Sequence, residues 1–166
     1  LGLAHSTVMA LALADPPESA TNTVSIADLS ANLVDVNLAN RTDITVLEFT
    51  ITNNHPNSFR ITIHSDNDGQ YRHPSWTQGN QHAGTFIDYT VKIIPTGAGT
   101  LGSTEPVLPN NHDMAAAADG DIVLDFSSAT VGTENKVYAL QVSTASKDKL
   151  LAGNFSETFH VTIDNL

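Results

Sequence analysis

The sequence predicts an all-β protein, built as an antiparallel sandwich of about seven to eight strands. Short segments of alternating apolar and polar residues are typical of half-buried strands, and no helical pattern is long enough for a crossover. Nineteen Thr and fourteen Asn against four Lys favour strands joined by polar turns over helices. A length of 166 residues indicates a single domain that buries its own core.

The clearest strands are predicted in order along the chain from their period of two. Residues 46–52 and 59–64 alternate around the turn at 53–58, which predicts a hairpin. Further strands are predicted at 86–94, 121–126, 137–143 and 155–164, and weaker ones at 24–26 and 33–38. Glu157 interrupts the apolar face of the last strand. We expect a loop at 70–84 and an irregular connection at 95–118, which closes with one helical turn at 115–118.

Charge and cysteine content exclude several classes of partner and chemistry. A net charge of −11 repels nucleic acid and anionic membrane surfaces, and no apolar run of 18 residues exists to insert into a bilayer. The absence of Cys removes thiol nucleophiles, thiolate zinc sites and structural disulfides. Because neither a nucleophile elbow nor a phosphate-binding glycine loop is present, we expect no enzyme and no cofactor.

The segment 1–14 has the pattern of a strand that stands apart from the body. Its larger residues fall at odd positions and its smaller ones at even positions, with Val8 as the exception. The linker 15–21 contains Pro16-Pro17, a stiff spacer that cannot continue sheet pairing, and the body follows at 22–166. Ala12-Leu13-Ala14 also fits a signal-peptide cleavage site. As a strand, the segment can complete its own sheet or add to a neighbour's, and the spacing leaves both open.

The end of the chain resembles a known family of fibre subunits. Leu-Ala-Gly-Asn-Phe-Ser-Glu-Thr-Phe-His-Val-Thr-Ile at 151–163 is similar to the terminal strand of pilin-type domains of the spore coat protein U and chaperone-usher kind, and the hairpin at 49–63 to their central strands. The resemblance implies an incomplete immunoglobulin-like sandwich, completed by the N-terminal donor strand of the next subunit. Many members carry a disulfide and this chain has none, which leaves open a convergent filament protein with the same architecture.

These observations predict a structural subunit of an extracellular, cell-surface filament, which serves adhesion or biofilm cohesion. Its partners are other copies of itself, joined head to tail, together with a possible secretion or assembly machinery. The donor strand contributes Leu1, Leu3, Met9, Leu11 and Leu13. The acceptor groove is expected to be lined by Leu47, Phe49, Phe159, Val161 and Ile163.

The alternative function is a monomeric secreted module that binds carbohydrate or calcium. Trp76, Tyr71 and Tyr89 are the candidates for a sugar-stacking platform. Asp66-Asn67-Asp68-Gly69 resembles the opening of a calcium loop but lacks the closing Glu, so a plain turn is the simpler interpretation. No metal site is expected from the spacing of the seven His, and the calcium candidates are Asp66, Asp68, Asp119 and Asp121.

Overall fold

The computed structural model describes residues 2–8, 23–28, 38–53, 57–79, 81–82, 84–101, 103–128 and 135–166, and the backbone alone at 2–8, 23, 27, 28 and 128. These residues form strands and contain no helix, which confirms the all-β class. The strands are β1 (Gly2–Val8), β2 (Thr23–Asp28), β3 (Ile44–Thr52), β4 (Phe59–Ser65), β5 (Gln70–Arg72), β6 (Phe86–Thr96), β7 (Ser103–Thr104), β8 (His112–Asp113), β9 (Ile122–Ser128), β10 (Asn135–Thr144) and β11 (Gly153–Asn165). The described residues therefore include no helix that could span a membrane.

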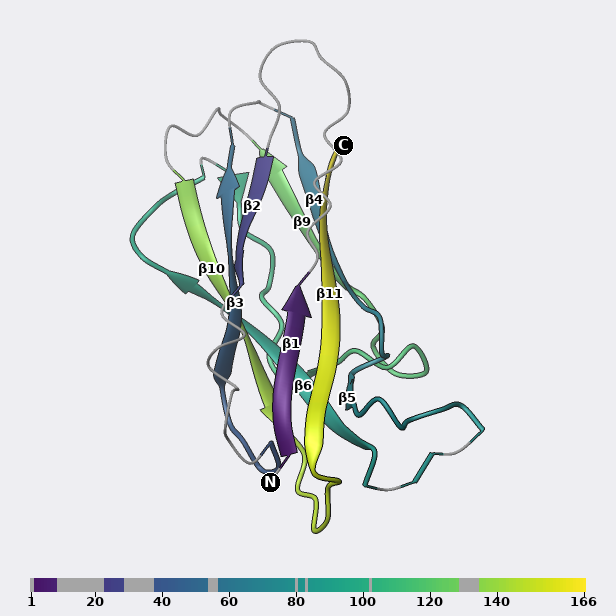
Figure 1. Ribbon diagram of the computed structural model, residues 1–166. Coiled ribbons are helices and arrows are strands. Elements are labelled where there is room, and N and C mark those ends of the chain that lie inside the picture. The colour runs from purple at the N-terminus through teal and green to yellow at the C-terminus, as the bar shows by residue number, and fades with distance from the viewer. Residues whose placement is uncertain are drawn as a thin grey trace.

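The strands form a sandwich-like arrangement whose two layers share β6 (Figure 1). One layer has the order β2-β3-β10-β6, with β8 on β6, and the other contains β1, β5, β11, β4, β9 and β7. β6 pairs with β5 over residues 86–88 and with β10 over residues 89–96, so it passes from one layer to the other. Every described pairing is antiparallel except that of β1 with β11.

The core lies between the layers and follows from the alternation of apolar residues. In β4, Phe59, Ile61 and Ile63 are fully buried, while Arg60 and Thr62 between them are partly exposed. Phe59 stacks on Phe126 of β9, with ring centroids 4.8 Å apart. Both Val46 and Leu47 are buried because the β3–β10 register shifts beside them, a bulge that turns two successive residues of β3 inward.

The strands predicted from alternation are found at the expected places, with bounds that differ by a few residues. Three short strands are additional: β5 lies in the predicted loop at 70–84, and β7 and β8 lie in the predicted irregular connection. Strands of two or three residues are too short to show a period. The alanine run forms a turn closed by a hydrogen bond from Ala118 N to Ala115 O. Of the strand predicted at 33–38, only Leu38 is described, and it is buried outside any strand.

Candidate functional site

The candidate site is the edge of β11 that holds the N-terminal strand. β1 pairs with the first half of β11 in parallel, from Gly2 opposite Gly153 to Val8 opposite Phe159 (Figure 1). Among the described elements, β1 pairs with β11 alone. The other edge of β11 is occupied by β4 and, opposite Ser156, by β5. In the single chain, the N-terminal strand thus completes the chain's own sheet, which is one of the two arrangements that the spacing left open.

The register of β1 differs from the one expected for a donor strand. The predicted donor residue Leu3 has exposed Asn154 as its Cα partner, and Leu1, Met9, Leu11 and Leu13 lie outside the described residues. The even-numbered, mostly small residues are the ones opposite the buried positions of β11: Ala4 is paired with Phe155, Ser6 with Glu157 and Val8 with Phe159. A slip of one residue would reverse this assignment, because a strand has a period of two.

The predicted acceptor residues are all buried in one core, but they do not line one groove. Phe159, Val161 and Ile163 lie on β11, and only Phe159 belongs to the stretch that pairs with β1. Leu47 and Phe49 lie on β3, where β2 and β10 occupy the two edges. Of the predicted set, only Phe159 therefore lies beside the N-terminal strand, whereas Leu47 and Phe49 lie on a strand whose two edges are already paired.

A buried carboxylate lies in the middle of the β1-binding stretch. Glu157 has no exposed surface, and both of its oxygens accept hydrogen bonds. Ser65 Oγ and Tyr89 OH each donate to Oε2 at 2.8 Å. The backbone N–H groups of Thr158 and Asn67 donate to Oε1 at 2.7 and 3.2 Å. Four donors from β4, the following turn, β6 and β11 thus converge on one side chain.

The buried environment raises the pKa values of Glu157 and Tyr89. Burial raises the pKa of Glu157 to about 7, although its four hydrogen bonds favour the charged form and oppose the shift. Burial also raises the pKa of Tyr89 well above its ordinary value, and the nearby Glu157 charge adds to this effect. Tyr89 therefore stays protonated as a donor, while the Glu157 carboxyl titrates near neutral pH.

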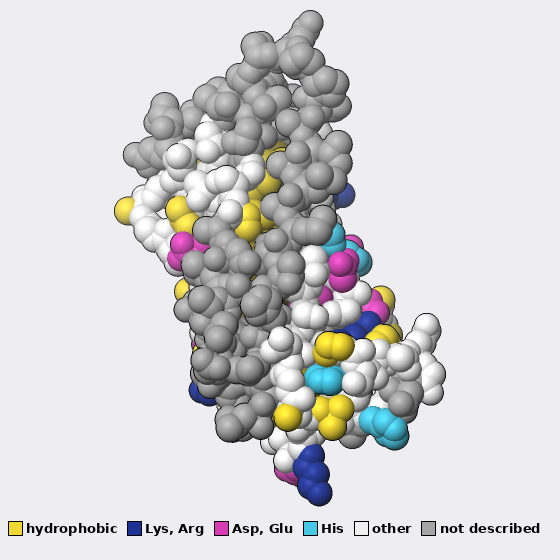
Figure 2. Space-filling view, viewed as in Figure 1, with side chains coloured by type: hydrophobic (Ala, Val, Ile, Leu, Met, Phe, Trp, Pro, Cys, Tyr) yellow, Lys and Arg dark blue, Asp and Glu magenta, His cyan; other side chains and the backbone are white. Residues whose placement is uncertain are grey.

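A second polar cluster lies on the outer face of the same layer, where His64 and His160 are cross-strand partners on β4 and β11. His64 Nδ1 is 2.7 Å from Asp121 Oδ1, and His160 Nε2 is 2.8 Å from Asp66 Oδ1. The hydrogen bond to Asp121 raises the pKa of His64, and partial burial opposes it. Figure 2 shows histidine and acidic side chains next to each other on the right-hand side of the molecule.

The four calcium candidates do not come together. Asp66 and Asp121 flank His64, Asp68 lies 3.9 Å from Arg72, and Asp119 accepts a hydrogen bond from the backbone N–H of Asp113. Within the described part of the chain, no group of three His, Asp or Glu side chains is placed to hold a metal ion. Each of these aspartates instead has a local partner.

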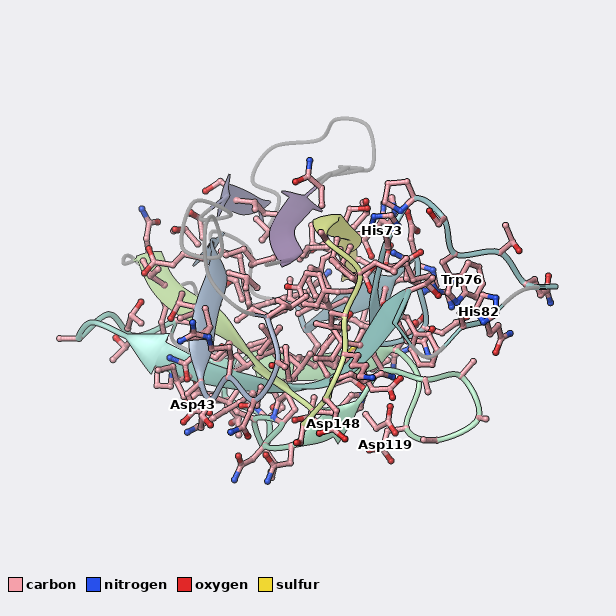
Figure 3. All side chains as sticks on the ribbon, turned by 60° about the horizontal axis from the view of Figure 1, so that its bottom comes forward. Asp43, His73, Trp76, His82, Asp119 and Asp148 are labelled. Carbon is pink, nitrogen blue, oxygen red and sulfur yellow. The ribbon has the colours of Figure 1, made fainter. Side chains whose placement is uncertain are left out.

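The aromatic residues named for sugar binding do not form an exposed platform. Tyr71 and Tyr89 are buried and pack against each other, with ring centroids 5.1 Å apart. Trp76 lies in the loop after β5, near His73 and His82, as Figure 3 shows. The Arg72 guanidinium covers its ring at 3.6 Å. The expectation of a three-residue stacking surface is therefore wrong.

Glu157 was recognisable in the sequence, but its hydrogen-bond partners were not. The signal was an acidic residue at an apolar position of an alternating strand, yet Ser65 and Tyr89 lie 92 and 68 residues away in the sequence. No sequence pattern indicated the His64–Asp121 pair, because the two residues meet only through the pairing of β4 with β9. Comparisons with protein-family models, with curated proteins and with solved structures found no match to this chain.

Proposed function

We propose that this protein is a structural subunit of an extracellular filament, in which the N-terminal strand of one copy pairs with β11 of the next. The observation that carries the proposal is the attachment of β1: it pairs with one strand, at one edge, and is joined to β2 through residues 9–22. An element bound in this way can be replaced by the same element of another copy. Head-to-tail replacement does not close on itself, so repetition gives a fibre.

The energetics of β1 support exchange. A backbone hydrogen bond contributes about 1 kcal/mol net, while fixing each strand residue costs about 1–2 kcal/mol of conformational entropy. Backbone pairing along the seven residues of β1 is thus roughly offset by the cost of ordering them. The net free energy of binding β1 to β11 therefore depends on side-chain burial and on the effective concentration of the strand, which the linker sets. A neighbour's strand offers the same backbone pairing and can replace the chain's own strand when its local concentration approaches that effective concentration.

The alternative, a monomeric module for sugar or calcium, receives less support. Its stacking surface would include Tyr71 and Tyr89, which are buried in the core. Its calcium candidates are held apart by partners of their own. We therefore retain adhesion or biofilm cohesion as the role of the proposed filament, with copies of the chain as the principal partners.

Because the chain lacks Cys, a pair of introduced cysteines reports which copy supplies β1. His5 and Ser156 are Cα partners in the β1–β11 register, and neighbouring strands lie about 5 Å apart, within the range of a disulfide. The double variant His5→Cys/Ser156→Cys should form a ladder of covalent multimers on oxidation if strands exchange. In His5→Cys/Thr104→Cys, the second cysteine lies on β7, away from β11, and this control should form no ladder.

Electron microscopy and deletion of residues 1–14 complete the test. The full chain should form filaments, and the deletion should leave soluble protein without them. A double variant that crosslinks only within its own chain, from a protein that forms no filaments, would overturn the proposal in favour of a monomer.

A further inference from the structure

Glu157 has features that a purely structural core position does not require. Of the carboxylates in the described part of the chain, it alone is fully buried. It lies at the centre of the β11 stretch that pairs with β1, opposite Ser6. An apolar residue would fit the alternation of Phe155, Phe159 and Val161 along the same face.

The described groups around Glu157 include no cationic partner for its charge. β4 and the turn after it provide Ser65 and the Asn67 backbone, and β6 provides Tyr89, against which Tyr71 of β5 packs. None of the ion pairs among the described residues includes Glu157. The nearby charged residues pair elsewhere: Asp66 with His160, and Arg72 with Asp68. β1 brings one titratable residue, His5, opposite Ser156.

Among the described residues, Glu157 is thus a buried carboxyl with four neutral donors and no cationic partner. The cost of its charge depends on how well the edge of β11 excludes water. When β1 leaves, that edge opens beside Glu157 and the charged form becomes easier to hydrate. The two states of the edge then differ in their affinity for a proton, and by linkage the proton changes the affinity for the strand.

We propose that pairing of the N-terminal strand with β11 is coupled to protonation of Glu157. The affinity of β11 for the strand is then higher at low pH and lower at high pH. The same coupling acts on a strand from the chain itself and on one from a neighbour. Its meaning for assembly rests on the proposed filament function, whereas the coupling itself is a property of the single chain.

The size of the coupling follows from the difference in proton affinity between the two states. Burial raises the pKa of Glu157 to about 7 when β1 is in place. A pKa about one unit or more lower in the strand-free state changes strand affinity by about ten-fold between roughly pH 5.5 and 8.5. The change in affinity should occur between the lower pKa of the strand-free state and the pKa of the strand-bound state.

Hydrogen exchange of the β1 amides in the full chain directly measures how strongly β1 pairs with β11. After correction for intrinsic exchange, protection of residues 2–8 should be about ten-fold greater at roughly pH 5.5 than at 8.5. Glu157→Gln, which keeps the shape and cannot ionise, should abolish the dependence. Asp164→Asn removes an exposed carboxylate from the same strand and should leave it intact, as should His5→Gln, which removes the titratable residue of β1.

Tyr89→Phe keeps the inference testable if Glu157→Gln fails to fold. Removing this donor to the charged form should raise the pKa of Glu157 and move the transition to higher pH. Constant protection of β1 across this range in the wild type, or an equal change in Glu157→Gln, would overturn the coupling. Because exchange is read in the single chain, these results stand apart from filament formation, which microscopy scores separately.

Discussion

Replacing Glu157 by Gln should change how the stability of the whole fold depends on pH. The side chain is fully buried, and burial raises its pKa from 4.5 to about 7. Folding therefore favours the protonated form. The resulting stabilisation is fully present below about pH 4.5, the pKa of the unfolded chain, and is lost as the pH rises through about 7.

The difference of about 2.5 pKa units sets the magnitude. At about 1.4 kcal/mol per unit, the wild type should lose about 3 kcal/mol of unfolding free energy between pH 4 and pH 8 through this group. Glu157→Gln should lose none through this position. His64, whose pKa is also raised, contributes in the same direction in both proteins, so the difference between them isolates Glu157.

Urea unfolding at several pH values, followed by circular dichroism, measures the two stability curves. The free energy of unfolding of the wild type minus that of Glu157→Gln should fall by about 3 kcal/mol from pH 4 to pH 8. Most of this change should occur between about pH 5 and 7. A difference that stays flat, or one that rises with pH, would refute the assignment of a raised pKa to this carboxyl.

Three further predictions concern the linker, the core and one close approach. Shortening the linker 15–21 should keep β1 from reaching its own β11 and should increase multimers, measured by light scattering; more monomer would contradict this. In a double-mutant cycle, Phe59→Leu and Phe126→Leu together should cost about 1 kcal/mol less than the sum of the single changes, measured in urea, because the rings stack; additive costs would contradict this. Gly99→Ala should destabilise by about 1–3 kcal/mol, because its Cβ would overlap the Asn135 carbonyl oxygen of β10. The matched change Gly79→Ala has no atom within 4 Å of the new Cβ and should leave the melting temperature unchanged, so equal effects would contradict the argument.

Most of the fold was predictable because half-buried strands repeat every two residues. β4 and β11 each alternate over seven or more residues and β3 over six, which is long enough to show the period and the buried face. β5, β7 and β8 were not predictable, because two or three residues carry no period and their pairing is set by longer neighbours.

Individual parts of the site could be predicted from the sequence, but the way in which the fold arranges them could not. Alternation at residues 1–14 indicated a strand, and β1 is a strand over Gly2–Val8. Its parallel pairing and its register with β11 are long-range choices that the local pattern does not encode. The partners of Glu157 could not be inferred for the same reason, since they lie on strands that meet only in the folded sheet.

The parallel register of β1 and β11 also determines how the pair bears force. Tension that pulls on the Val8 end of β1 and on the Gly153 end of β11 acts along both strands in opposite directions. Such a load shears the pair, and all of the residue pairs from Gly2 to Val8 resist at once. Tension at the two ends that lie together would instead peel the strands apart one pair at a time. The direction of pulling would thus decide whether this joint behaves as a strong link or as one that opens under small loads.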